Sequence, residues 1–147
     1  MDVIMTANAQ KFIQPLMFQT ITKRKVYTQM FDEIDAVDVK HVSLAQKADV
    51  ALIAPATANT IAKLAQGVAD DMLSTVFMAV PKKTPKYIAP AMNTEMWKNP
   101  AFQRNLAQVL EDGYIQIPPK SSQLACGTVG MGAMANVKDI VDIILNK

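Results

Sequence analysis

Two side chains that occur once each, His41 and Cys126, are the most reactive groups in the sequence. An imidazole has a reference pKa near ~6.5 and suits the removal of a proton, whereas a thiol, near ~8.5, suits its donation. A lone histidine is nevertheless more often structural or solvated than catalytic, and a lone cysteine is usually a small buried hydrophobe. Their chemistry alone leaves both interpretations open.

Residues 55–60 form a turn of small and polar residues between a predicted strand and a predicted helix. Small side chains let a ligand approach the backbone, and three polar side chains can bind it: Thr57, Asn59 and Thr60. The same three residues can instead cap the helix, which is their more common role. Chemistry therefore favours capping here without excluding a ligand.

Residues 90–97 place an amide, two methionines and the only tryptophan just past another predicted strand. A core cluster of methionine and tryptophan explains the apolar members. It does not explain Asn93, because a buried amide must find hydrogen-bond partners. Asn93 is therefore a candidate for ligand binding.

Residues 120–135 carry three glycines and the only cysteine, and they follow neither helical nor strand periodicity. We expect a loop here. Loops of ~15 residues are uncommon inside a compact domain and are usually functional or disordered. This segment is therefore a candidate for a functional role, like the segments 55–60 and 90–97.

The elements that must position these groups alternate short β-like runs with helical periodicity, which predicts βα units around a mainly parallel sheet. The apolar run 49–54 indicates a strand buried on both faces of that sheet. The other predicted strands are 3–5, 25–28, 87–89 and 114–117. The predicted helical segments are 8–13, 15–21, a stretch after His41, 61–65, 73–80, 102–110 and 137–145, and residues 32–38 are a predicted loop.

In open α/β sheets, ligands bind beyond the carboxyl ends of the strands, often at helix N-termini. The segments in that position are 6–8, 55–60, 90–97 and the glycine-containing loop after residue 117. The topology therefore predicts that the candidate groups lie on one edge of the sheet.

The bulk properties predict one soluble, cytosolic domain. The chain has 147 residues, half of them apolar, and a net charge of +2 that is too small to indicate a nucleic-acid or membrane-surface partner. A single cysteine excludes an intrachain disulfide, and one histidine with one cysteine excludes the usual zinc ligand sets. We find no apolar stretch near the ~20 residues that a membrane helix needs, and no signal-peptide pattern at the start.

Three segments together resemble the signatures of the flavin-dependent cysteine decarboxylases, in the family's order and spacing. They are APATANTIAKLAQGVADD (54–71), PAMNTEMWKNP (90–100) and LACGTVGMGAM (124–134). In addition, KHVSLAQKADV (40–50) resembles the segment that holds the family's active-site histidine. The similarity covers nearly the whole chain.

The resemblance implies an α/β, flavodoxin-like (Rossmann-like) three-layer fold with a mainly parallel sheet, assembled as trimers or dodecamers with FMN at a subunit interface. The family opens with a strand, a phosphate-binding turn and a helix, and residues 1–147 are expected to form a single flavoprotein domain that begins at the family's second strand. By position, the implied catalytic residues are His41 as base and Cys126 as acid, and the implied substrate contacts are Asn93, Gln123 and Ala125. The implied FMN contacts are Thr6, Ala7, Asn8, Thr57, Ala58, Asn59, Thr60 and Ala91.

Within the family, the ACG segment ending in Gly-Ala-Met resembles the branch that decarboxylates 4'-phosphopantothenoylcysteine to 4'-phosphopantetheine in coenzyme A biosynthesis. One alternative is a peptidyl-cysteine decarboxylase of lantibiotic maturation, which shares the P-x-M-N-x-x-M-W pattern. Another is a non-catalytic FMN-binding regulatory subunit, against which the presence of His41, Asn93 and Cys126 argues.

Overall fold

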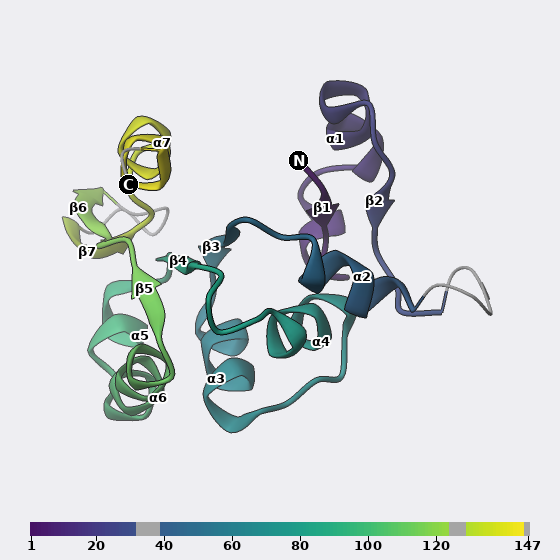
Figure 1. Cartoon of the computed structure of the whole chain (residues 1–147). Coiled ribbons are helices and arrows are strands. Elements are labelled where there is room, and N and C mark those ends of the chain that lie inside the picture. The colour runs from purple at the N-terminus through teal and green to yellow at the C-terminus, as the bar shows by residue number, and fades with distance from the viewer. Residues whose placement is uncertain (32–38, 124–128, 146–147) are drawn as a thin grey trace. The chain divides into compact units, whose positions relative to one another are not determined.

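The computed structural model describes residues 1–31, 39–123 and 129–145, which form two compact units (Figure 1). Unit 1 comprises Met1–Ala48 and Gly67–Pro81, and unit 2 comprises Asp49–Gln66 and Lys82–Lys147. The predicted loop at residues 32–38 lies outside the described residues.

Unit 1 is built on two short parallel strands. Strand β1 (Val3–Ile4) pairs with β2 (Val26–Tyr27), and the 3₁₀ helix η1 (Ala9–Lys11) and helix α1 (Pro15–Thr22) connect them. Pro15 opens α1 as predicted, because its fixed φ and missing N–H suit the first turn of a helix. The other helices described in the unit are α2 (Lys40–Gln46) and α4 (Met72–Ala79), which pack together.

The start of α4 is held by a reciprocal cap. The Ser74 backbone N–H donates to the Asp71 carboxylate at 2.8 Å, and the Asp71 N–H donates to the Ser74 hydroxyl at 3.2 Å. The exchange satisfies two backbone donors that have no partner inside the helix. The predicted helix at 73–80 is thus confirmed as α4, with Asp71 as the capping residue.

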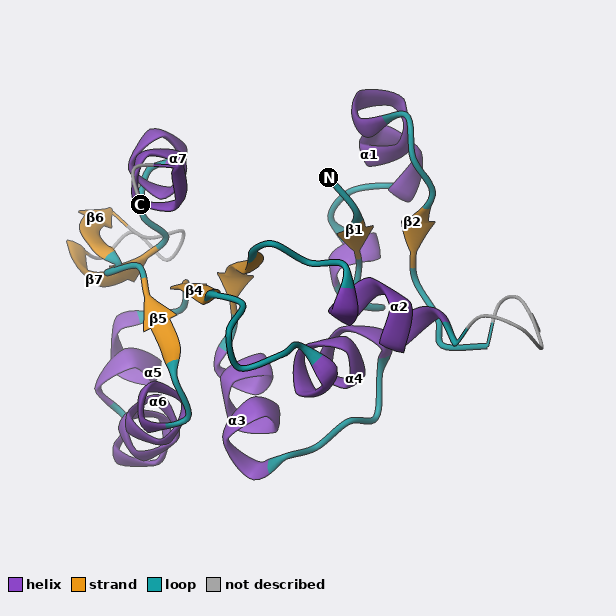
Figure 2. Ribbon diagram, in the orientation of Figure 1, coloured by secondary structure: helices purple, strands orange, loops and turns teal. Residues whose placement is uncertain are grey.

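Unit 2 contains three parallel strands in the order β3 (Ala51–Ala56), β4 (Lys86–Pro90) and β5 (Tyr114–Gln116) (Figure 2). Helix α3 (Ala58–Gln66) follows β3, whereas α5 (Thr94–Lys98) and α6 (Pro100–Glu111) connect β4 to β5. Gly67 and Gly113 end α3 and α6 with φ of 67° and 89°, values that glycine adopts without a steric penalty. The predicted helical segments 61–65 and 102–110 are confirmed and lie within α3 and α6.

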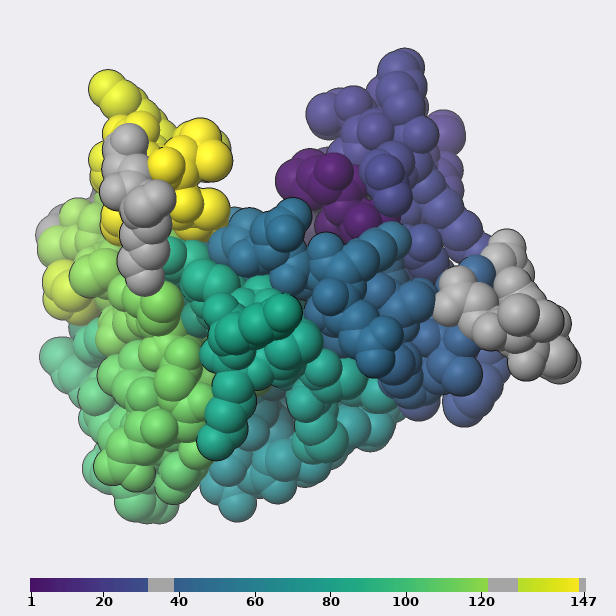
Figure 3. Space-filling view, viewed as in Figure 1, coloured from purple at the N-terminus to yellow at the C-terminus, as the bar shows by residue number. Residues whose placement is uncertain are grey.

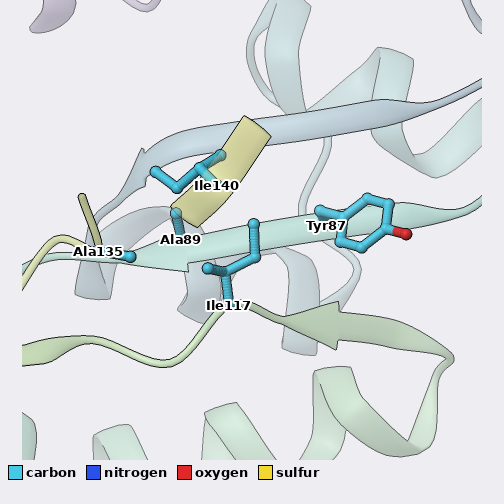
Figure 4. Close-up of a cluster of buried hydrophobic side chains, with 5 residues drawn as sticks. All are labelled: Tyr87, Ala89, Ile117, Ala135 and Ile140. Atoms are coloured by element: carbon cyan, nitrogen blue, oxygen red, sulfur yellow. The ribbon is translucent and has the colours of Figure 1, made fainter. Parts of the chain in front are cut away.

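One core cluster joins the sheet to the last helix, α7 (Val137–Leu145). Tyr87 and Ala89 on β4 pack with Ile117, Ala135 and, from α7, Ile140 (Figure 4). All five side chains are buried, so the helix covers this face of β4. Covering a strand face in this way is what a layered α/β arrangement requires.

Strand β3 corrects one sequence expectation. The apolar run at residues 49–54 predicts burial on both faces, yet Ile53 is 4% exposed while its neighbour Leu52 is 38% exposed. Neighbouring side chains point to opposite faces of a strand, so β3 is packed at Ile53 and open at Leu52.

The segment 120–135 corrects another expectation. It is not one continuous loop, because strands β6 (Lys120–Gln123) and β7 (Val129–Ala133) form an antiparallel hairpin (Figure 2). Glycines at residues 130 and 132 weaken the local strand signal. The second strand is held by a hydrogen bond between Gly132 and Met92, in the turn after β4. Among the described strands this is the one antiparallel pairing, so the predicted mainly parallel topology is confirmed.

Candidate functional site

The turn between β3 and α3 carries two hydroxyls in direct contact. The Thr60 backbone N–H donates to the Thr57 hydroxyl at 3.3 Å, and the two hydroxyl oxygens lie 3.1 Å apart. Thr57 and Asn59 are exposed, and Thr60 is half-buried. Capping therefore does occupy the Thr57 oxygen, and the pair still presents polar atoms beyond the carboxyl end of β3.

The chain after β4 lies directly beside this turn. The Ala91 N–H donates to the carbonyl of Ala56, the last residue of β3, at 3.1 Å. This bond brings the 55–60 and 90–97 segments to the same edge of the sheet, as the topology predicts. Ala91 and Ala58 are half-buried, and their small side chains leave the backbone approachable.

Asn93 is the N-cap of α5. Its side-chain oxygen accepts a hydrogen bond from the Glu95 N–H at 2.8 Å, and the residue is exposed. The side-chain oxygen, for which the sequence suggested no partner, is therefore bonded to a local backbone group. Being exposed, the amide also stands where a ligand could reach it.

The β6–β7 hairpin meets the same turn. The Met92 N–H donates to the Gly132 carbonyl at 2.8 Å, which ties β7 to the residue before Asn93. Gln123 is the last residue of β6, whereas Ala125 and Cys126 lie outside the described residues. Unit 2 thus brings together the two strand-end turns and the hairpin strands that flank the cysteine in sequence.

The remaining predicted site residues belong to unit 1. Thr6 follows β1, and its hydroxyl accepts from the Ala9 N–H at 3.1 Å, while Ala7 and Asn8 are exposed. His41 is the second residue of α2 and is half-buried. Thr6 lies after a strand as predicted, whereas His41 lies within a helix that was predicted to begin after it.

Within the 90–97 segment, sequence reasoning did not single out Thr94. Its hydroxyl oxygen is buried and has no hydrogen-bond partner among the described residues. A threonine at the start of a helix normally suggests a cap, but here Asn93 supplies the cap. The glycines of the 129–133 segment are the signal that another backbone approaches closely.

The residues gathered in unit 2 have a chemistry that suits a flavin. A flavin mononucleotide needs hydrogen-bond donors and acceptors around its ring edge and sugar, together with small residues where its flat ring lies. In unit 2, exposed or half-buried hydroxyl and amide groups stand after β3, and small alanines stand after β3 and β4. The N-terminus of α3 adds backbone N–H groups to the same end of β3.

The match with known proteins defines the class. The family model described as Flavoprotein matches residues 1–147, and the chain belongs to this family. The chain is 47% identical over 143 residues to a probable phosphopantothenoylcysteine decarboxylase of Streptococcus mutans serotype c, a match that covers 97% of this chain and 80% of that protein. It also matches longer bifunctional coenzyme A biosynthesis proteins, such as that of Bacillus subtilis, and spans 34% of the length of that protein.

Solved structures agree with the sequence relatives. The FMN-dependent cysteine decarboxylase SpaF superposes with a TM-score of 0.80 at 36% identity, covering 95% of this chain and 74% of that chain. A PPC decarboxylase mutant complexed with pantothenoylaminoethenethiol superposes with a TM-score of 0.82 at 32% identity, covering 99% and 83%. The predicted resemblance to the flavin-dependent cysteine decarboxylases and the three-layer α/β fold are confirmed. Within the described residues, no helix has the length and apolar character needed to cross a membrane.

Proposed function

We propose that this chain is an FMN-dependent carboxy-lyase that converts 4'-phosphopantothenoylcysteine to 4'-phosphopantetheine in coenzyme A biosynthesis. One observation carries the proposal. Two backbone hydrogen bonds, Ala91 to Ala56 at 3.1 Å and Met92 to Gly132 at 2.8 Å, gather three family signatures at one sheet edge. The name of the Streptococcus mutans relative supports the same substrate. Neither a peptidyl-cysteine substrate nor a non-catalytic role has comparable support.

The residues proposed to hold FMN are of two chemical kinds. Hydroxyl and amide groups would bind its polar atoms, and alanines would lie against its ring. These residues are Thr6, Ala7, Asn8, Thr57, Ala58, Asn59, Thr60 and Ala91.

The chemistry needs an electron sink, because loss of CO2 from a cysteine carboxylate would otherwise leave an unstabilised carbanion. When bound, FMN would supply the two-electron oxidation that turns the thiol side chain of the substrate into a C=S sink, and the matching two-electron reduction after CO2 has left. His41 removes the thiol proton of the substrate, and Asn93 binds its carboxylate through the side-chain amide. Cys126 donates a proton to the decarboxylated product, and Gln123 and Ala125 contact the substrate.

We also place the chain in the cytoplasm as a homotrimer, or a dodecamer, with FMN at a subunit interface. The support within unit 1 is α1, which has no buried residue. Leu16 and Ile21 on this helix are 67% and 71% exposed, and Phe12, just before it, is 92% exposed. Figure 3 shows this segment in dark blue at the surface of unit 1. Several exposed apolar side chains on one short segment are typical of interaction surfaces.

The test is turnover by the purified protein loaded with FMN. We expect a visible flavin absorbance and release of one CO2 for each phosphopantetheine formed. The matched variant His41→Asn should keep its flavin and fold while turnover falls on the order of a thousandfold. A wild-type chain that holds flavin and releases no CO2 from phosphopantothenoylcysteine contradicts the proposal.

A further inference from the structure

Strand β7 and the turn after β4 meet backbone to backbone at Gly132. The glycine is buried with φ of 131°, and its carbonyl accepts the Met92 N–H at 2.8 Å. A Cβ atom built on Gly132 would lie 2.3 Å from the Met92 carbonyl oxygen. No rotation of a side chain relieves that clash, so a residue other than glycine would force the two segments apart.

We infer that Gly132 is a positioning residue for substrate binding, which sets the β6–β7 hairpin against the turn that carries Asn93. The inference rests on the proposed function. Met92 directly precedes Asn93, and Gln123 pairs with Val129 at the far end of the hairpin from the Lys120–Ala133 pair. A displacement at Gly132 therefore moves the hairpin strands relative to Asn93. Because Asn93 and Gln123 are both proposed substrate contacts, this movement changes how the substrate is bound.

The base of the hairpin has a separate attachment. The Lys120 ammonium donates to the side-chain oxygen of Asn136, and the Asn136 amide donates to the Asp139 carboxylate on α7 at 3.0 Å. These contacts do not involve Gly132. Loss of the Gly132 junction is thus expected to re-orient the hairpin about its base without unfolding unit 2.

The neighbouring glycine makes a different contact. A Cβ atom on Gly130 would lie 2.4 Å from the Thr94 hydroxyl oxygen, which is the end of a side chain. The methyl carbon and the Cβ atom of Thr94 would lie 3.0 and 3.2 Å away, so the obstacle at Gly130 is one side chain, which a truncation would remove. The obstacle at Gly132 is the Met92 backbone, so the backbone junction is the one at Gly132.

The test compares Gly132→Ala with Gly113→Ala. Gly113 also has a positive φ, 89°, but a Cβ there would meet nothing within 4 Å. Both variants carry a strained backbone, and only the first disturbs the junction. We expect Gly132→Ala to raise KM for phosphopantothenoylcysteine by about tenfold while kcat changes by less than about threefold and flavin is retained. Gly113→Ala should leave KM unchanged.

Hydrogen exchange of the Met92 amide gives a readout that does not depend on turnover. Exchange should become on the order of tenfold faster in Gly132→Ala and stay unchanged in Gly113→Ala, because only the first variant loses the bond to residue 132. Equal KM values for Gly132→Ala and wild type overturn the inference, as does unchanged Met92 exchange.

Two further outcomes are decided by the wild-type protein. If Gly132→Ala does not fold, hydrogen exchange of the wild-type chain decides. Saturating phosphopantetheine must then slow exchange of the Met92 amide and of the hairpin amides together. Slower exchange of the hairpin amides alone overturns the inference. A flavin-loaded wild-type chain that releases no CO2 contradicts the proposed function instead. In that case the Met92 exchange rates still decide whether Gly132 holds the junction.

Discussion

Asn93 is the residue where a local structural role and a proposed chemical role coincide. Its side-chain oxygen caps α5, and its amide nitrogen is the group proposed to bind a carboxylate. Aspartate is as good an N-cap as asparagine and has nearly the same volume. Asn93→Asp should therefore keep the turn while placing a negative charge against the substrate carboxylate.

We expect Asn93→Asp to lower kcat/KM by about a thousandfold, because charge repulsion adds to the loss of a hydrogen bond. Flavin absorbance should be retained. The matched control is Asn99→Asp, since Asn99 caps α6 by accepting the Ala101 N–H at 2.9 Å. An equal loss of activity in the two variants, or a loss of flavin in the first, would show that Asn93 does not act on the substrate carboxylate.

At the scale of elements, the edge of the three-stranded sheet carries a buried phenol. Tyr114 on β5 pairs with Lys86 on β4, whose ammonium lies 4.5 Å from the ring centroid. Burial, with the negative charge of Asp112 in addition, raises the pKa of Tyr114 to about 12. The folded chain therefore holds the phenol proton more tightly than the unfolded chain, in which the pKa is ~10.

This difference predicts a loss of stability at high pH. Below pH ~10 the phenol is protonated in both states and contributes no pH dependence, whereas between ~10 and ~12 only the unfolded state releases the proton. The free energy of unfolding should fall across that window by on the order of 2 kcal/mol more in wild type than in Tyr114→Phe. Urea denaturation of both proteins from about pH 9 to about pH 12 measures the difference. Parallel curves would contradict the assignment.

At the scale of the whole molecule, the exposed apolar side chains of α1 predict an assembly. Placing a lysine in a subunit interface leaves a buried charge without a partner, which costs several kcal/mol. Leu16→Lys and Ile21→Lys should therefore dissociate the proposed trimer, and flavin held at the interface should be released with it.

Light scattering at fixed protein concentration measures the mass of each variant. Val137→Lys is the control, because Val137 is an apolar residue of α7 with a similar exposure of 69%. The trimer should persist in this control. If the mass stays unchanged in Leu16→Lys, or falls equally in Val137→Lys, α1 does not form the subunit interface.

Much of the architecture follows from short-range signals in the sequence. Pro15 starts α1, and Gly67 and Gly113 end α3 and α6, because these residues act through the sterics of their own backbone. Alternation of short apolar runs with helical periodicity likewise predicts the parallel βα arrangement. The motifs in residues 54–71, 90–100 and 124–134 are specific enough to identify the family by themselves.

Tertiary structure alone decided the features that depend on contacts between distant residues. The hairpin at 120–133 carries glycines that are typical of a loop, and only the bond between Met92 and Gly132 shows what they accommodate. Leu52 has the side chain of a core residue, yet its exposure depends on which element covers that face of β3. Sequence determines what each segment can do locally, whereas the approach of two backbones far apart in the chain is set by packing, which no local pattern encodes.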